Sequence, residues 1–147
     1  RIYPINSFKG TTAESDNDLG LSGIFRVMIA VRDIEAAKEV YGTKLGLEVE
    51  CAETDVERGV EKVVCRPPSG GRVELIAPVD TDNAFAANVE DYLGAKGEGL
   101  YALVLQSADL ESTRSALIER GVGVTGDSIL ELPLTDTFGA RIFVESP

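Results

Sequence analysis

The chain has 147 residues, with 14 lysines and arginines against 25 aspartates and glutamates, so its formal net charge is −11 at pH 7. Phosphate backbones and anionic membrane surfaces are bound by clustered cations, so this balance argues against a general nucleic-acid binder or membrane binder. A content of 44% hydrophobic and 27% charged residues is typical of a globular domain with its own core and excludes a fibrous or disordered chain.

The first segment, residues 1–22, is rich in Ser, Thr, Asn, Asp and Gly and shows no hydrophobic period. Such a composition buries little apolar surface, so we expect an N-terminal arm, with a short strand at 2–5. Residues 23–147 are expected to form a single domain, because regular alternation begins there and continues to the end of the chain.

The domain opens with a predicted strand, helix and three further strands. Side chains alternate in type over 25–31, which is typical of a strand with one covered face. Asp33 is placed to cap a helix over about 34–45, which Gly46 would end. The strands that follow are expected near 47–53, 59–66 and 72–77.

A linker, 79–99, separates this unit from a second one and is expected to contain a short helix near 84–93. After it come a strand near 101–106, a helix between Asp109 and Gly121, and strands near 122–125, 128–133 and 140–145. The segment DIEAAK at 33–38 matches DLESTR at 109–114 in character. The sequence therefore predicts an α+β domain of two βαβββ modules, about 23–78 and 100–147.

Histidine is absent from the chain, which excludes Ser-His-Asp and Cys-His nucleophile systems and imidazole metal ligands. Cys51 and Cys65 lack CxxC spacing, so we expect two buried thiols in a reducing cytoplasm. No apolar run reaches the roughly 20 residues that span a bilayer, and nothing at the start is typical of a signal peptide. We therefore expect a cytoplasmic protein without a membrane segment.

The two-module pattern resembles the vicinal oxygen chelate superfamily, which includes glyoxalase I, bleomycin resistance protein and methylmalonyl-CoA epimerase. The likeness is closest to the epimerase and is carried by five segments: RVMIAV at 26–31, LGL at 45–47, VELIAP at 73–78, KGEGL at 96–100 and FGARI at 138–142. The resemblance implies a curved eight-stranded cup, an incomplete barrel with its helices outside, and a homodimer.

In that family, four metal ligands face the cup, and their positions fall here on Arg26, Glu74, Ala102 and Phe143. Strand alternation independently places these residues opposite the face that the helices are expected to cover. A single carboxylate beside an arginine supplies too few donors for a divalent cation. The resemblance therefore implies a degenerate metal site, and we expect no metal and no cofactor. The acid and base positions of the epimerase fall on Lys62 and Phe143.

Other side chains are expected to complete the cup. Arg26 and Glu74 would pair across neighbouring strands and replace the charge of the ion, although the two residues could also only neutralise each other. The resemblance places Lys62 in the cup, and Arg58 shares the parity of Lys62. The remaining candidates for ligand contact are Met28, Arg58, Lys62, Ala102, Val104, Gln106 and Phe143. Alternatively, Arg58, Lys62 and Arg66 form an exposed strand face that nearby acids neutralise.

These features favour a metal-independent protein that binds a small organic, anionic ligand in the cup, similar to bleomycin resistance proteins. The alternative is a metal-free isomerase or lyase derived from an epimerase-like ancestor. In that case Arg26 and Lys62 would stabilise an enolate, and Glu74 or Glu145 would act as base. Glu145 could equally be a solvated residue at a strand end, and a scaffold with an empty cup also fits the sequence.

Overall fold

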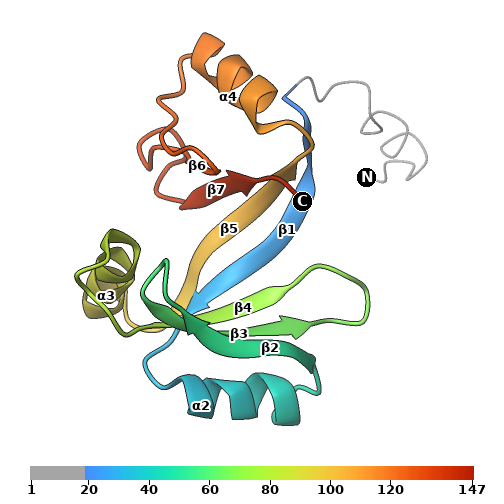
Figure 1. Cartoon of the computed structure of the whole chain (residues 1–147), viewed down its shortest axis with the longest axis vertical. Helices are drawn as coiled ribbons and strands as arrows, with labels where there is room; N and C mark the ends of the chain where they lie inside the picture. The colour runs from blue at the N-terminus through green and yellow to red at the C-terminus, as the bar shows by residue number, and fades with distance from the viewer. Residues whose placement is uncertain (1–18) are drawn as a thin grey trace, which may run out of the picture.

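The computed structural model describes residues 19–147, which form one open mixed sheet with helices around it (Figure 1). In these residues the sheet has seven strands in the order β2-β3-β4-β1-β5-β7-β6. The strands are β1 (Leu21–Ala30), β2 (Glu48–Asp55), β3 (Val60–Arg66), β4 (Val73–Pro78), β5 (Gly99–Ser107), β6 (Ile129–Glu131) and β7 (Ile142–Glu145). The helices are α2 (Ile34–Lys38) with its π-helical continuation η1 (Glu39–Lys44), α3 (Ala84–Lys96) and α4 (Leu110–Glu119).

The two halves of the sheet follow the same pairing pattern. In the first half β4 runs parallel to β1, and in the second half β7 runs parallel to β5. The long antiparallel pair of β1 and β5 joins the halves in the middle of the sheet. The predicted α+β class is thereby confirmed. No helix among residues 19–147 has both the length and the apolar content to cross a bilayer.

The second half has fewer strands than the sequence predicts. In the described chain the strand expected at 122–125 is reduced to one isolated bridge, between Thr125 and Glu131. Gly123 and Gly126 flank this bridge, and glycine weakens a strand because it has no side chain to pack. The eight-stranded cup is therefore a seven-stranded open sheet in these residues, with β2 and β6 as its edges.

The N-terminal boundary also differs from the predicted one. β1 begins at Leu21, which pairs with Ser107, so the strand includes the last residues of the expected arm 1–22. The strand expected at 2–5 lies outside the described residues.

The first helix begins and ends where its sequence signals predict. The Asp33 carboxylate accepts hydrogen bonds from the backbone N–H groups of Glu35 and Ala36, both at 3.1 Å, as an N-cap does. After Lys38 the helix widens, and the Leu45 N–H donates to the Val40 carbonyl five residues earlier.

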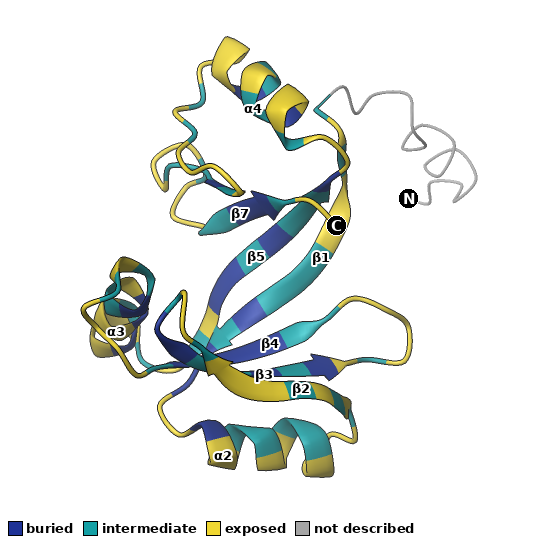
Figure 2. Ribbon diagram, in the orientation of Figure 1, coloured by how far each residue is buried: buried dark blue, intermediate teal, exposed yellow. Residues whose placement is uncertain are grey.

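Two buried clusters lie on opposite faces of the sheet. One lies beneath α2 and consists of Val31, Ile34, Val63, Cys65, Leu75 and Ala77. This confirms that Leu75 points toward the helix and leaves its neighbour Glu74 on the other face. We call that other face, which carries Arg26, Glu74, Val104 and Phe143, the cup face. Figure 2 shows buried residues running along the central strands.

The linker helix α3 packs on the cup face, whereas the sequence-based prediction places all helices outside the cup. Ala86, Val89 and Leu93, spaced three and four residues apart, join a buried cluster with Met28 and Ile76. Such spacing forms an apolar helix stripe. The helix therefore fills one end of the cup and leaves a cavity open in the region around Arg26 and Arg58.

A register shift in β5 changes the direction of Tyr101. The pairing moves from Met28 with Ala102 to Ile29 with Leu100, which leaves Tyr101 as the extra residue of a bulge. A bulge redirects side chains locally. Strict alternation along the strand would place Tyr101 on the same face as Leu103. Tyr101 is instead buried in the cup-face cluster.

The turn between β2 and β3 depends on glycine at position 59. Gly59 has φ +70°, and a Cβ there would lie 2.7 Å from the Asp80 carbonyl oxygen and 2.9 Å from the Asn83 Cβ. Gly46 has nearly the same φ, +75°, with nothing within 4 Å of its Cβ position. We expect Gly46→Ala to cost about 1–2 kcal/mol for its left-handed backbone.

Gly59→Ala should cost about 1–3 kcal/mol more than Gly46→Ala, because its methyl group also meets fixed backbone. Urea unfolding of the two variants measures this difference. Equal losses in the two variants would show that the turn does not press against 80–83.

Candidate functional site

Glu74 is the central residue of the cup face. It lies on β4 with its side chain only 3% exposed, and the sheet brings two arginines to it. Arg26 on β1 places its Nε 2.8 Å from Glu74 Oε1. Arg58 donates through Nη2 to Glu74 Oε2 at 2.5 Å. Both carboxylate oxygens are therefore engaged by guanidinium groups.

Arg26 is shared between two carboxylates. Its Nη1 contacts Oε2 of Glu145, at the end of β7. Its Nε faces Glu74 as an opposite charge, without the alignment that a hydrogen bond requires. Arg26 therefore joins the first half of the sheet to the second through charge, and its own side chain is 16% exposed.

Arg58 reaches the cup from the β2–β3 turn, which Asp55 holds in shape. Asp55 accepts the Arg58 backbone N–H at 3.2 Å and the Arg58 Nε at 2.7 Å. Asn83, the N-cap of α3, donates from Nδ2 to the Glu57 carbonyl oxygen at 2.5 Å and ties the turn to that helix. The Arg58 guanidinium also lies 5.0 Å from the centre of the Phe85 ring, within the range of a cation–π contact.

The charges of this turn reinforce each other. Burial alone would lower the pKa of Arg58, but the neighbouring Glu74 and Asp55 carboxylates outweigh it and raise the pKa. Burial likewise opposes ionisation of Asp55, yet hydrogen bonds and charge from Arg58 hold the pKa of Asp55 below its ordinary value. Both groups are thus kept charged.

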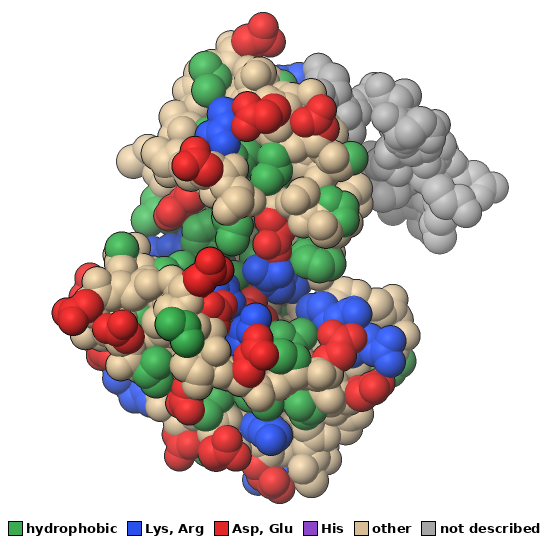
Figure 3. Space-filling view, in the orientation of Figure 1, with side chains coloured by type: hydrophobic (Ala, Val, Ile, Leu, Met, Phe, Trp, Pro, Cys, Tyr) green, Lys and Arg blue, Asp and Glu red, His purple; other side chains and the backbone are tan. Residues whose placement is uncertain are grey.

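A cavity of about 210 Å³ opens beside these arginines. Its walls combine the two guanidinium groups with apolar and aromatic side chains and the glycine-rich segment before β6. The lining residues are Arg26, Met28, Arg58, Phe85, Thr125, Gly126, Ile129, Glu131 and Phe143. Figure 3 shows basic and acidic side chains side by side across the middle of this view.

The cup does not fit a divalent cation. Glu74 has both oxygens turned to guanidinium groups, and two positive charges stand beside it. Within residues 19–147 no group of three or more Cys, Asp and Glu side chains is arranged to hold an ion. Metal sites need several converging donors and no competing cation, and the side chains around Glu74 do not meet these requirements.

The structure brings some of the predicted site residues together and separates others. Arg26, Met28, Arg58 and Phe143 line one cavity, and Glu74 lies directly behind them. Ala102 and Val104 belong to the buried core of the cup face. Gln106 is half-buried, and its backbone carbonyl accepts a hydrogen bond from the Ser22 hydroxyl. The functional roles of all these residues remain predictions.

The three basic residues Arg58, Lys62 and Arg66, predicted to share one strand face, belong to separate ion pairs. Lys62 lies at the rim, 3.4 Å from Glu53 and 3.9 Å from Asp55. Arg66 is exposed and donates to Glu48 at 2.7 Å. The alternative of an exposed face neutralised by acids therefore describes Arg66, while Arg58 points into the cup.

Sequence reasoning missed several residues of the site, namely Asp55, Phe85, Thr125, Gly126, Ile129 and Glu131. Asp55 carried a usable signal, since Asp at the start and Gly at the end of DVERG is typical of a tight turn. Phe85 carried none, because strand alternation says nothing about which face a linker helix covers.

Comparison with known families gives one match that covers most of the chain. A model described as the Glyoxalase/Bleomycin resistance protein/Dioxygenase superfamily matches residues 25–131. This range includes Arg26, Arg58 and Glu74. No curated protein sequence matches the chain.

Solved structures of similar shape come from several bacteria. Methylmalonyl-CoA epimerase from Mycobacterium tuberculosis is 24% identical, with a TM-score of 0.79 over 92% of this chain and 93% of that one. A variant of the Streptomyces coelicolor epimerase in complex with 2-nitronate-propionyl-CoA is 26% identical, with a TM-score of 0.73 over 86% of this chain and 97% of that one. A hypothetical protein from Bacillus halodurans C-125 is 17% identical, with a TM-score of 0.76 over 85% and 94%.

Removing the central carboxylate should destabilise the fold. Glu74→Gln leaves Arg26 and Arg58 without their shared counter-charge, so we expect a loss of about 3–5 kcal/mol in the free energy of unfolding. Glu53→Gln, which removes an exposed carboxylate from Lys62, should cost less than about 1 kcal/mol. Chemical denaturation measures both values, and a loss at Glu74 no larger than that at Glu53 would contradict the central role of Glu74.

Acid should weaken the β2–β3 turn through Asp55. A carboxyl whose pKa is lowered by folding contributes stability above its unfolded pKa, near 3.8, and this contribution is lost as the pH falls through the lower folded value. Asp55→Asn should therefore be less stable than the parent chain at neutral pH, and its stability should fall less steeply below about pH 4. Thermal melting from pH 7 to pH 2 tests this, and parallel curves would contradict it.

Proposed function

The chain belongs to the Glyoxalase/Bleomycin resistance protein/Dioxygenase superfamily, and from this premise we propose that it binds a small organic anion in the cup, without a metal ion. The proposal rests above all on Arg58. Its Nη1 is buried and has no hydrogen-bond partner among the described residues, and Arg58 is one of the residues that line the cup cavity.

A buried guanidinium nitrogen without a partner is costly, by about 1–3 kcal/mol or more for a charged group. A ligand carboxylate in the cavity would accept from it and restore the missing bond. Such charge-assisted bonds are stronger than bonds between neutral groups. The net charge of the whole chain does not oppose this, because the site presents Arg26 and Arg58 directly to the cavity.

The remaining walls of the cavity determine which organic group the ligand can carry. Met28, Phe85, Ile129 and Phe143 offer apolar and aromatic surface. The cavity, at about 210 Å³, lies below the roughly 300 Å³ at which drug-sized pockets begin. We therefore assign the ligand to small carboxylates with a short acyl chain or a single ring.

The same residues support the proposed metal independence. Arg26 and Arg58 supply the positive charge beside Glu74 that an ion would supply. A divalent cation there would be repelled by two guanidinium groups and would have to displace both of them from the Glu74 carboxylate. The ligand therefore meets cationic nitrogen donors, and its carboxylate is held by hydrogen bonds.

A second candidate is a metal-free isomerase or lyase, because structural neighbours in Streptomyces coelicolor and Mycobacterium tuberculosis are methylmalonyl-CoA epimerases. Here Glu74 and Glu145 flank Arg26, so a base and a cation for a developing enolate stand together. Lys62 would assist from the rim. Solvent deuterium would then enter the carbon beside the carbonyl of a 2-oxo acid, and Glu145→Gln would stop this exchange. Tight binding of the acid without deuterium exchange would support the first proposal, a protein that only binds its ligand.

We also propose a cytoplasmic homodimer. The strands β2 and β6 are the edges of the described sheet, and an exposed edge offers unpaired backbone groups to a second chain. A symmetric dimer would cover such edges.

Binding of phenylacetate tests the proposed function. We expect it to bind at least tenfold more tightly than neutral phenylacetamide, because only the carboxylate satisfies Arg58. Arg58→Gln should abolish this difference, whereas Lys44→Gln, which removes an exposed charge in η1, should preserve it. Isothermal titration calorimetry measures the affinities.

Equal affinity for the acid and the amide would contradict the proposal, as would an unchanged preference in Arg58→Gln. If Arg58→Gln does not fold, Arg58→Lys replaces it in the test, because lysine keeps the positive charge but lacks the planar guanidinium group. It should retain a weakened preference for the acid.

A further inference from the structure

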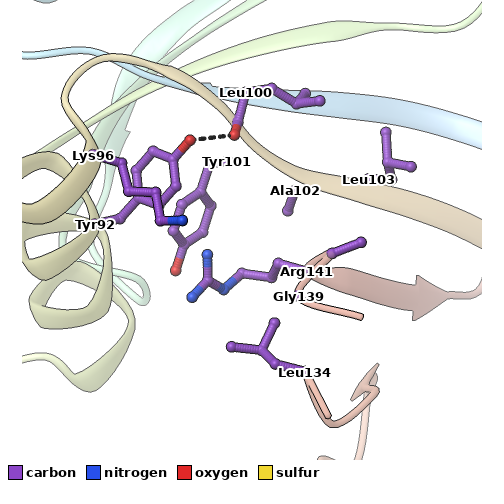
Figure 4. A pocket seen from close by; sticks show the side chains of 10 residues that line it. Tyr92, Lys96, Leu100, Tyr101, Ala102, Leu103, Leu134, Gly139 and Arg141 are labelled. Carbon is purple, nitrogen blue, oxygen red and sulfur yellow. Dashed lines mark hydrogen bonds between the residues drawn. The ribbon is translucent and has the colours of Figure 1, made fainter. Parts of the chain in front are cut away.

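A second cavity, of about 390 Å³, shares no lining residue with the first and lies beside the first residues of β5 (Figure 4). It is enclosed by the end of α3 and by the loop that leads into β7. Its apolar walls come from Tyr92, Leu100 and Leu134, and its polar groups are Lys96, Tyr101 and Arg141. A volume of this size is typical of a pocket for a small organic molecule.

Arg141 is held in this cavity by aromatic rings. Its guanidinium carbon lies 4.2 Å from the centre of the Tyr101 ring and 5.9 Å from that of Tyr92. Tyr92 is itself fixed, since its hydroxyl donates to the Leu100 carbonyl at 2.6 Å. Stacking uses the face of the guanidinium group and leaves its N–H edge free to bind an anion.

Two cations converge here without a counter-charge. Figure 4 shows the Lys96 ammonium and the Arg141 guanidinium reaching toward the same space from different elements. No carboxylate of residues 19–147 forms an ion pair with either side chain. In a chain with 25 acidic residues against 14 basic ones, two unpaired cations in one cavity mark an anion site.

Tyr101 supplies an independent observation. Its side chain is buried, with the residue only 4% exposed, and its hydroxyl points into the same space (Figure 4). Within the described part of the chain, no hydrogen-bond partner is present for this hydroxyl. Burial raises the pKa of Tyr101 and Glu131 adds to this, while Arg141 opposes it. The phenol therefore stays protonated and is available as a donor.

We propose that this cavity binds the phosphate group of a small organic phosphate monoester, held by Lys96, Tyr101 and Arg141. Two positive charges and one hydroxyl donor match a dianion with three acceptor oxygens. The organic part of the ligand lies against Tyr92, Leu100 and Leu134. This site is separate from the cup and is independent of the function proposed there, since the two cavities share no lining residue.

Phenyl phosphate is the probe that tests this site, with inorganic phosphate and benzoate as comparisons. Calorimetry and ³¹P NMR should show phenyl phosphate binding more tightly than either, because only phenyl phosphate carries both a dianion and a ring. Arg141→Gln should weaken binding at least tenfold, and Lys96→Gln and Tyr101→Phe several-fold. Lys44→Gln controls for the change in net charge and should have no effect.

Tyr101→Phe and Lys96→Gln keep the test decisive where Arg141→Gln disturbs folding, since the first keeps the ring and the second alters an exposed side chain. Arg58→Gln separates the two proposals, because it should leave phenyl phosphate binding unchanged. In Arg58→Gln, in which the cup no longer prefers an acid, benzoate binding as tightly as phenyl phosphate would overturn the assignment to phosphate. Absence of binding at millimolar concentration, or binding that these three substitutions leave intact, would overturn the site itself.

Discussion

The cup depends on one interaction, the contact of the buried Glu74 carboxylate with two guanidinium groups. Glu74 is almost fully removed from water, and an unpaired charge there would be costly. Arg26 and Arg58 engage one oxygen each. Because each arginine also contacts a further acid, Glu145 or Asp55, the charges form a continuous chain across the sheet. The functions proposed for the cup depend on these ion pairs.

This arrangement gives the cup a polarity opposite to that of a metal site. The carboxylate that could bind an ion lies behind the cations, and the cations face the cavity. Three local features maintain this placement of the cations toward the cavity. The Asp55 turn directs Arg58 inward, Phe85 on α3 lies against its guanidinium group, and α3 fills the remaining end of the sheet. The proposed anion site therefore requires no rearrangement of the strands.

The sequence predicted the features that depend on strand period and local caps. Alternation placed Glu74 opposite Leu75, and the Asp33 cap was found as expected. The features it could not predict depend on tertiary packing. A bulge at Tyr101 interrupts the two-residue alternation that the prediction assumes. The face of the sheet that α3 covers is determined by contacts with residues distant in the sequence. The missing strand near Thr125 reflects nearby glycines, whose effect on pairing depends on the partner strand.

Direct measurement of metal binding tests the central claim most closely. Equilibrium dialysis of the purified chain against Co²⁺, Mn²⁺ or Zn²⁺, followed by elemental analysis, reports how many ions each chain retains. The account predicts far less than one ion per chain in the parent protein, because two guanidinium groups occupy the Glu74 carboxylate, and equally little in Glu74→Gln, which has no carboxylate at this position. One ion retained per chain, and lost in Glu74→Gln, would contradict it.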